Sequence, residues 1–459
     1  LTLEGVSPEH GDSVTSFFRQ RAGLTTNLAL LDSGLTSAVN YYRRKGYDMA
    51  HIRSAEIVQY PLPGRAEPQW GLTVEFDEGI VGKIEIEGNR RTRDWVIRGL
   101  IEQETGERYS SEKVARSLEN LHATGLFESV SPEVHRGDSG AVLHFTLEER
   151  PFWRLRLGAR YDIVNGFEGA AELGDDNFLG SSWRLNMGAF GGERRWKAYA
   201  SLGGDRVWVT FLAPRAELYV RGRDFEVWES DSVTATPNVT RYGVQLSLGH
   251  QIKRLGTVFA AVGTEQVQFG EEGEASSRYN MHRLTFLSIV DTRDERQFPR
   301  SGKYHRGYIT FSQDILGGEY SFTKSYASLQ SYWTWTEPLT FRPYAMGGYI
   351  AGGPPFFEQF ELGEEIDFWG YHPDQRRGNS FFKAGFDLRL NPMDPIYIFG
   401  GLSWGQTWQK DAKLELEDMI WGWGAGWGVA TPLGPFRLTW GRNSEKLEEI
   451  TLSFGYEFE

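Results

Sequence analysis

The sequence predicts two small α+β modules followed by an all-β transmembrane barrel of about 16 antiparallel strands. A pattern of helices and strands occurs twice in the first third, and from Phe152 onward apolar and polar residues alternate with a period of two. No stretch approaches the ~18 consecutive apolar residues that a membrane-spanning helix needs. The mean hydropathy of -0.45 fits a barrel, because every second residue of a barrel strand faces a polar lumen.

The first third is predicted to be a tandem repeat of about 75 residues with the order β-α-α-β-β, and each copy can bury a small core. The predicted boundaries are residues 1–78 and 79–150 for the modules and 151–459 for the barrel. Helices are expected at Ser13–Ala22, Leu30–Lys45, Arg93–Gln103 and from about Ser111 to Gly125, with Glu112–Leu121 as the body of the last. Strands are expected at Leu1–Val6, His51–Tyr60, Gly71–Phe76, Val81–Glu87, Ser131–His135 and Ala141–Leu147.

The barrel is predicted from rows of apolar residues that alternate with polar or small ones. In the first segment, Trp153, Leu155 and Leu157 alternate with Arg154, Arg156 and Gly158, which indicates a lipid-facing row and a lumen-facing row. The segment from Trp196 to Arg221 fits either two strands or three. A soluble β-sandwich is the alternative, but it does not explain an apolar face on almost every strand. Further rows are Trp183-Leu185-Met187-Ala189, Tyr242-Val244-Leu246-Leu248, Phe382-Ala384-Phe386-Leu388, Trp421-Trp423-Ala425-Trp427-Val429 and Ile450-Leu452-Phe454-Tyr456-Phe458.

Composition narrows the function further. The 16 Trp and 20 Tyr suit the two membrane interfaces, and a net charge of -13 argues against nucleic acid as a partner. The chain has no cysteine, and its nine histidines are scattered without metal-ligand spacing. Gly401-Leu402-Ser403-Trp404-Gly405 matches the G-x-S-x-G pattern, but it lies inside a period-two strand with no helix after it. We therefore expect no enzyme activity, no metal and no cofactor.

The two modules share a landmark at the end of their second helix. A helix stopped by glycine and then followed by an aromatic residue occurs at Tyr41–Tyr47, around Gly46, and at Leu121–Phe127, around Gly125. This arrangement resembles the POTRA domain of outer-membrane assembly and transport proteins. The resemblance implies that both modules are periplasmic and precede a barrel in the bacterial outer membrane.

Two stretches of the barrel resemble the BamA/TamA superfamily of assembly and translocation barrels. The first is a turn with the superfamily's D-x-R-D…P-x-x-G pattern, formed by Asp291, Arg293, Asp294, Pro299 and Gly302. The second lies about five strands from the C-terminus and resembles a long loop that folds back into the lumen with an R-G-[FY] tip. Its residues include Phe360-Glu361-Leu362-Gly363, Phe368, Trp369, Gly370, Tyr371 and Gly378-Asn379.

The loop departs from the superfamily pattern at its tip. Gly370 and Tyr371 match, but the usual arginine is Trp369, which puts the usual tip ion pair in doubt. Arg376 and Arg377 are candidates to supply the charge instead, just before Gly378.

The resemblance covers essentially the whole chain and implies a function. In this superfamily the POTRA modules capture extended clients by β-augmentation, and the first and last barrel strands form a weak seam through which clients enter the membrane. The implied partners are the outer-membrane bilayer and unfolded outer-membrane or secreted polypeptides, with periplasmic chaperones or accessory lipoproteins as further candidates. The implied seam strands run from Phe152 to Asp162 and from Glu449 to Phe458, and contain Trp153, Leu155, Gly158, Phe454, Gly455, Tyr456 and Phe458. Gly158 and Gly455 are non-packing positions that could weaken the pairing.

Three other functions stay open at this point. The loop pattern also resembles the barrel of patatin-like outer-membrane phospholipases, whose catalytic domain would lie upstream of Leu1 and whose barrel would serve as anchor or export device. Two modules also fit the two-partner secretion transporters, although no plug helix is visible before Leu1. A passive diffusion porin fits least well, because it leaves the modules without a role.

Overall fold

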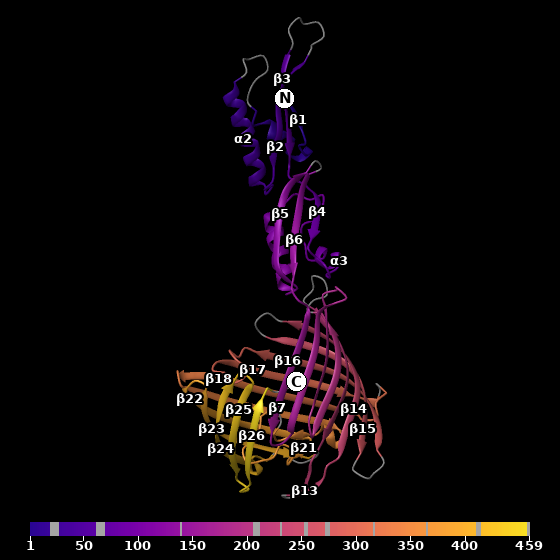
Figure 1. Cartoon of the computed structure of the whole chain (residues 1–459), viewed down its shortest axis with the longest axis vertical. Helices are drawn as coiled ribbons and strands as arrows, with labels where there is room; N and C mark the ends of the chain where they lie inside the picture. Colours follow the sequence, from indigo (N-terminus) through magenta and orange to yellow (C-terminus); the bar gives the residue numbers. More distant parts are fainter. Residues whose placement is uncertain are drawn as a thin grey trace. The chain divides into compact units, whose positions relative to one another are not determined.

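The computed structural model of the chain describes residues 1–18, 27–60, 69–137, 140–204, 212–229, 232–251, 256–270, 276–314, 317–363, 366–409 and 415–456. The chain divides into two compact units (Figure 1). The first comprises residues 1–152 together with residues 177–182, and the second comprises residues 153–176 and 183–459. The predicted boundaries at 78/79 and 150/151 stay predictions.

Both modules have the predicted order of helices and strands. In each, the first strand pairs in parallel with the last, so the last strand is central in a sheet of three. The first module contains β1 (Thr2–Glu4), α1 (Pro8–Thr15), α2 (Leu28–Arg44), β2 (His51–Tyr60) and β3 (Gln69–Asp77). The second contains β4 (Val81–Glu87), α3 (Asp94–Arg98), α4 (Ser111–Ala123), β5 (Phe127–Gly137) and β6 (Gly140–Glu149).

The helices differ from the prediction mainly at their ends. Helix α1 starts earlier than expected, because Pro8 takes its first position, where a fixed φ and a missing N–H cost nothing. The predicted residues Arg19–Ala22 lie outside the described part of the chain. Helix α3 stops at Arg98, five residues short of the predicted Gln103, because the poor helix former Gly99 follows directly.

The second unit is a closed antiparallel barrel, and its described residues contain sixteen wall strands, as predicted (Figure 1). The segment from Trp196 to Arg221 contributes two of them in its described part, rather than three. The wall strands are β7 (Trp153–Asp162), β8 (Gly166–Phe178), β9 (Trp183–Gly191), β10 (Arg195–Gly203), β11 (Leu212–Asp224), β14 (Asn238–Gln251), β15 (Thr257–Gly270), β16 (Ser277–Asp291), β17 (Gly302–Ser312), β18 (Phe322–Thr336), β19 (Leu339–Gly352), β22 (Ser380–Met393), β23 (Ile396–Trp408), β24 (Ile420–Thr431), β25 (Gly434–Asn443) and β26 (Glu448–Gly455).

The two faces of the wall follow the alternation of the sequence. Trp153, Leu155 and Leu157 are 63%, 66% and 74% exposed, as expected of side chains that face lipid. On the other face of the same strand, Arg154 pairs with Asp176 and Arg156 pairs with Glu172. No helix in the described part of the chain is long and apolar enough to cross a membrane.

Candidate functional site

The barrel closes through a short strand pair, β26 with β7. Only three residue pairs join β26 to β7 in the described residues: Ser453 with Asp162, Phe454 with Tyr161, and Gly455 with Arg160. Ten pairs join β7 to β8, and seven join β25 to β26. The described part of β26 therefore pairs with only the last three residues of β7, and one further backbone bond runs from Ile163, just after β7, to Leu452.

The predicted seam residues differ in their distance from this contact. Phe454 and Gly455 form part of it, and Tyr456 follows directly. Trp153, Leu155 and Gly158 lie in β7 but pair only with β8 among the described strands, Gly158 with Ala170. Phe458 lies outside the described residues. Gly455 adopts φ +104°, and a Cβ there would overlap the backbone oxygen of Ala159, so glycine is needed where the two strands meet.

The loop between β19 and β22 fills part of the lumen. Its residues Phe360, Leu362, Phe368 and Tyr371 are nearly fully buried, and it contacts lumen-facing positions on strands all around the wall. Phe360 packs where a side chain on Gly348 of β19 would stand, and Phe368 packs against Gly405 of β23. A short strand pair closes the base of the loop, β20 (Phe360–Glu361) with β21 (Arg377–Gly378).

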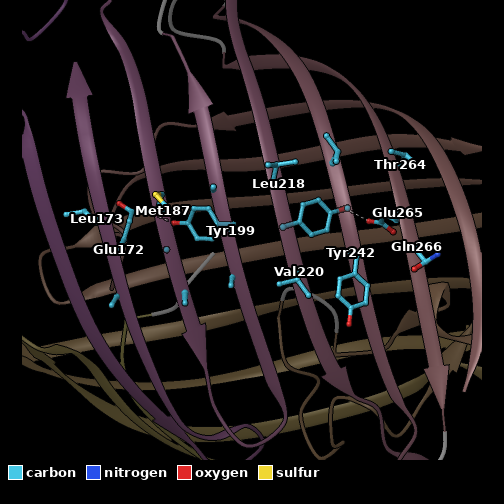
Figure 2. Close-up of a pocket in the computed structure, with 18 of the residues that line it drawn as sticks. Glu172, Leu173, Met187, Tyr199, Leu218, Val220, Tyr242, Thr264, Glu265 and Gln266 are labelled. Atoms are coloured by element: carbon cyan, nitrogen blue, oxygen red, sulfur yellow. Dashed lines mark hydrogen bonds between the residues drawn. The ribbon is translucent and has the colours of Figure 1, made fainter. Parts of the chain in front are cut away.

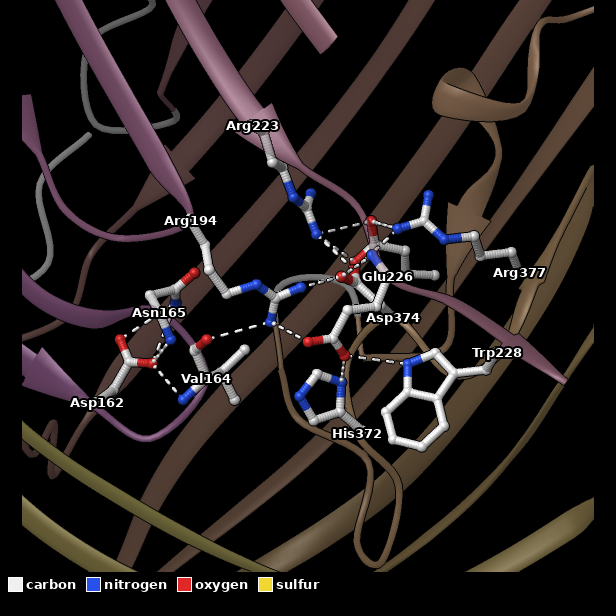
Figure 3. A network of polar contacts seen from close by, with 11 residues as sticks. Asp162, Val164, Asn165, Arg194, Arg223, Glu226, Trp228, His372, Asp374 and Arg377 are labelled. Atoms are coloured by element: carbon white, nitrogen blue, oxygen red, sulfur yellow. Dashed lines mark hydrogen bonds and ion pairs between the residues drawn. The ribbon is translucent and has the colours of Figure 1, made fainter. Parts of the chain in front are cut away.

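A buried carboxylate ties the loop to the first strands of the barrel (Figure 3). Asp374, whose side chain is 1% exposed, accepts from Arg194 at 2.6 Å, Arg223 at 2.7 Å and Arg377 at 2.8 Å. Burial acts to raise the pKa of Asp374, but Arg223 and Arg377 outweigh it and hold the pKa below its ordinary value. The carboxylate therefore stays charged and joins β10, β11 and the loop into one network.

A second carboxylate fixes the start of the loop to the far wall. Glu358, in the short 3-10 helix η3 (Phe356–Glu358), accepts from Arg241 of β14 and Arg283 of β16, each at 2.7 Å. Glu265 of β15 shares both guanidiniums, at 3.4 Å and 3.1 Å. Arg283 and Arg241 hold the pKa of Glu358 well below its usual range, although burial acts in the opposite direction.

The tip of the loop lies against β24 and β25. Asn443 donates to the backbone oxygen of Gly370 at 2.8 Å. Gly370 has φ +81°, and a Cβ there would lie 2.6 Å from the backbone nitrogen of Asn443, so only glycine fits. Trp369, which stands at the position of the usual arginine, packs its ring over Gly424 and Gly441. Trp369 and Gly370 are thus held by close packing and one hydrogen bond, at the position where the superfamily's arginine is missing.

The two candidate arginines have separate partners. Arg376 pairs with Glu445 at 2.6 Å, and the Tyr371 hydroxyl donates to the same carboxylate. Arg377 belongs instead to the Asp374 network and also contacts Glu361 at 3.0 Å. Gly378 packs against the backbone of Trp408 in β23.

The D-x-R-D stretch forms an extended turn between β16 and β17. Arg293 donates to Asp291 through Nε at 2.9 Å and through the guanidinium NH at 2.8 Å. Asp294 accepts from the backbone nitrogens of Glu295, Arg300 and Ser301. Gly302 has φ +101°, and a Cβ there would overlap the backbone oxygen of Thr292. Pro299 accepts from Arg389 of β22 through its backbone oxygen.

A pocket of about 890 Å³ lies on the wall formed by β7–β11 and β14–β16 (Figure 2). Its lining combines apolar side chains such as Leu173, Met187 and Leu218 with the polar residues Glu172, Tyr199 and Glu265. The Tyr199 hydroxyl donates to Glu172 at 2.5 Å.

Among the described residues no three metal-ligating side chains come together, and Ser403 lies inside β23 rather than at a strand-to-helix turn.

A family model described as the Omp85 superfamily domain matches residues 177–458. The chain belongs to the Omp85 superfamily. A second model, described as POTRA, surface antigen variable number repeat, matches residues 80–150. These matches confirm the resemblance to BamA/TamA-type barrels with POTRA modules.

The chain is also similar in sequence to individual members of the superfamily. The chain is 22% identical over 343 residues to the outer membrane protein assembly factor BamA of Nitratidesulfovibrio vulgaris, covering 72% of this chain and 42% of that protein. It is 28% identical over 251 residues to BamA of Neorickettsia risticii, covering 51% and 32%. The chain thus spans less than half the length of these curated relatives.

Solved structures show the same fold. The crystal structure of BamA from Haemophilus ducreyi lacking POTRA domains 1–3 matches with a TM-score of 0.73 and 14% identity, covering 99% of both chains. CdiB from Acinetobacter baumannii matches with a TM-score of 0.51 and 12% identity, covering 99% of this chain and 89% of that one. The protein is an outer-membrane β-barrel with periplasmic N-terminal modules.

Several residues that organise this Omp85 barrel were missed by the sequence reasoning. Asp374 and Glu358 lie in the loop, but apart from Arg377 their arginine partners lie more than 70 residues away in the sequence. Phe298, inside the predicted turn, is buried and stacks on Tyr397 with ring centroids 4.2 Å apart. The one signal in the sequence that could have identified Phe298 is that it is an aromatic residue among polar turn residues, because such a residue usually packs into a core.

Proposed function

We propose that this protein inserts polypeptides into the outer membrane or passes them across it, using the β26–β7 contact as the point of entry. The observation that carries the proposal is the three-residue pairing at that contact. BamA of two bacteria is described as an outer membrane protein assembly factor, and its sequence similarity to this chain supports the same kind of activity here.

The energetics of the contact favour opening at this place. A backbone hydrogen bond contributes about 1 kcal/mol net in water, and more where no water can replace it, as in lipid. The three residue pairs that the described residues form are therefore far cheaper to separate than the ten that join β7 to β8. A client strand that pairs with the edge of β7 would replace the lost bonds and bury its apolar face in lipid. Such an exchange needs no nucleotide.

The periplasmic modules would supply the client. Each sheet has two edge strands, and β2 offers ten residues without proline. The edge strand β5 of the second module contains Pro132, which has no N–H to donate. We assign client capture by β-augmentation to β2 of the first module.

A disulfide across the contact tests the seam. The chain has no cysteine, so Tyr161→Cys with Phe454→Cys, which are direct cross-strand partners, would introduce one defined bond. The oxidised protein should lose insertion of an outer-membrane client into proteoliposomes, and reduction should restore it. The matched control is Leu157→Cys with Ala171→Cys, partners in the β7–β8 pair. Full activity of the locked seam would refute the proposal, as would equal inhibition by the control.

A further inference from the structure

The lumen side of β24 carries glycine at four successive positions. Gly422, Gly424, Gly426 and Gly428, here called the glycine face, alternate with Trp421, Trp423, Ala425 and Trp427, whose side chains are exposed on the lipid side. Glycine weakens a strand, because it adds backbone entropy and packs no side chain. Three of the four glycines are nevertheless buried, so other parts of the chain fill the space that they leave.

The lumen loop fills the half of the glycine face that begins at Ile420. A Cβ on Gly424 would lie 2.5 Å from Cζ3 of Trp369, and one on Gly422 would lie 3.2 Å from Cε1 of Phe368. On the adjacent strand β25, a Cβ on Gly441 would lie 3.0 Å from the Trp369 ring. Any larger residue at these positions would displace the tip of the loop.

The turn between β16 and β17 covers the far end of the glycine face at Gly428, and Phe399 of β23 covers Gly426 between the turn and the loop. A Cβ on Gly428 would lie 3.1 Å from Cζ of Phe298, and one on Gly426 would lie 2.7 Å from Phe399 of β23. The guanidiniums of Arg437 and Arg389 lie 5.0 Å and 5.6 Å from the centre of the Phe298 ring.

The backbone beside Phe298 is held as well. Arg437 of β25 donates to the backbone oxygen of Gln297 at 2.8 Å, and Arg389 donates to that of Pro299. The Gln297 side chain donates to the hydroxyl of Tyr456, directly after β26, at 2.6 Å. The turn therefore contacts β22, β25 and the end of the last strand.

We propose that the glycine face of β24 is the common anchor of the lumen loop and of the turn between β16 and β17, and that the two together brace β24 and β25. The loop holds one end of these strands through Trp369, and the turn holds the other through Phe298. The brace holds β24 and β25 directly, whereas it reaches the last strand only through the hydrogen bond from Gln297 to Tyr456. Trp369 and Phe298 are positioning residues in this arrangement.

This inference concerns the rigidity of the barrel itself and does not rest on the proposed function. It is tested by hydrogen–deuterium exchange of the full chain in lipid nanodiscs without any client. Trp369→Ala and Phe298→Ala should each raise amide exchange in residues 420–443 by about tenfold, because each variant frees one end of the same strand pair. Trp423→Ala is the matched control, since it removes the same kind of side chain from the lipid side of β24.

The exchange data distinguish a joint brace on β24 and β25 from two local contacts, one of Trp369 and one of Phe298, that act independently. Faster exchange of residues 420–443 in both variants, with Trp423→Ala within about twofold of the parent, supports the proposal. Faster exchange of only the loop in Trp369→Ala, or of only the turn in Phe298→Ala, overturns it. If either alanine variant fails to fold, Trp369→Phe and Phe298→Leu replace it, because they keep an apolar side chain of smaller size. The exchange of residues 420–443 is then compared in the same way, and the expected increases are smaller.

Discussion

Asp374 is held by three guanidinium groups that come from three separate segments of the barrel. Arg194 precedes β10, Arg223 ends β11, and Arg377 belongs to the loop itself. Removing one partner from a buried ion pair usually costs about 3–5 kcal/mol, far more than breaking an exposed pair. The docked loop therefore depends on a few charges, and His372 lies among them.

His372 makes the loop sensitive to pH. Burial lowers the pKa of His372 below its ordinary value of 6.5, and its ring lies 3.4 Å from Glu226 and against Trp228, with Arg194, Asp374 and Glu361 as the other nearby charges. Below pH 6.5 the unfolded chain binds a proton that the folded chain does not, so stability falls as the pH falls toward the folded value. The depressed pKa of Asp374 has a different window, because its contribution is lost only in stronger acid.

We therefore expect the unfolding temperature of the barrel in detergent to drop between pH 7 and pH 5. The readout is heat-modifiable migration on gels, and His372→Gln should flatten this part of the profile without changing it below pH 4. A profile for His372→Gln that matches the parent would show that another group titrates.

At the scale of elements, we expect the edge strands β2 and β5 of the two modules to differ in how well an extended client strand can pair with them. Strand β2 exposes Ile57 by 47% on an edge without proline, whereas Pro132 interrupts the edge of β5. A photo-crosslinking residue at Ile57 should capture an unfolded outer-membrane client, and the same residue at Glu133 of β5 should capture little. Equal capture at both positions, or capture at Glu133 alone, would place the binding edge elsewhere.

The elements also differ in how well the sequence predicted them. Barrel strands were predictable, because lipid imposes an apolar residue at every second position, as in β7. Helix ends in the modules were less so, since short helices such as α1 and α3 depend on local caps and on packing. The seating of Trp369 on Gly424 could not be predicted, because it joins residues 55 positions apart through a shape that only the folded wall creates.

At the scale of the whole molecule, we expect the lumen loop to decide whether the barrel conducts ions. The loop is fixed to β10, β11, β14, β16 and β24, and its side chains are buried inside the wall. Replacing residues 355–378 with a short Gly-Ser linker should raise ion conductance in planar bilayers at least severalfold. The Glu448→Gln variant, which breaks only the exposed pair with Arg442, should conduct like the parent. An unchanged conductance after loop removal would mean that other segments close the lumen.

The lengths of the strands bear on the bilayer around the barrel. Strand β26 has 8 residues and β7 has 10, whereas β16 and β18 on the other side of the wall have 15 each. At ~3.4 Å per residue and a tilt of ~40°, 8 residues rise about 21 Å along the membrane normal and 15 rise about 39 Å. The hydrocarbon core is ~30 Å thick. We therefore expect the lipids beside the described part of the last strand to compress to match it, which would lower the cost of moving polar backbone across the membrane at that place.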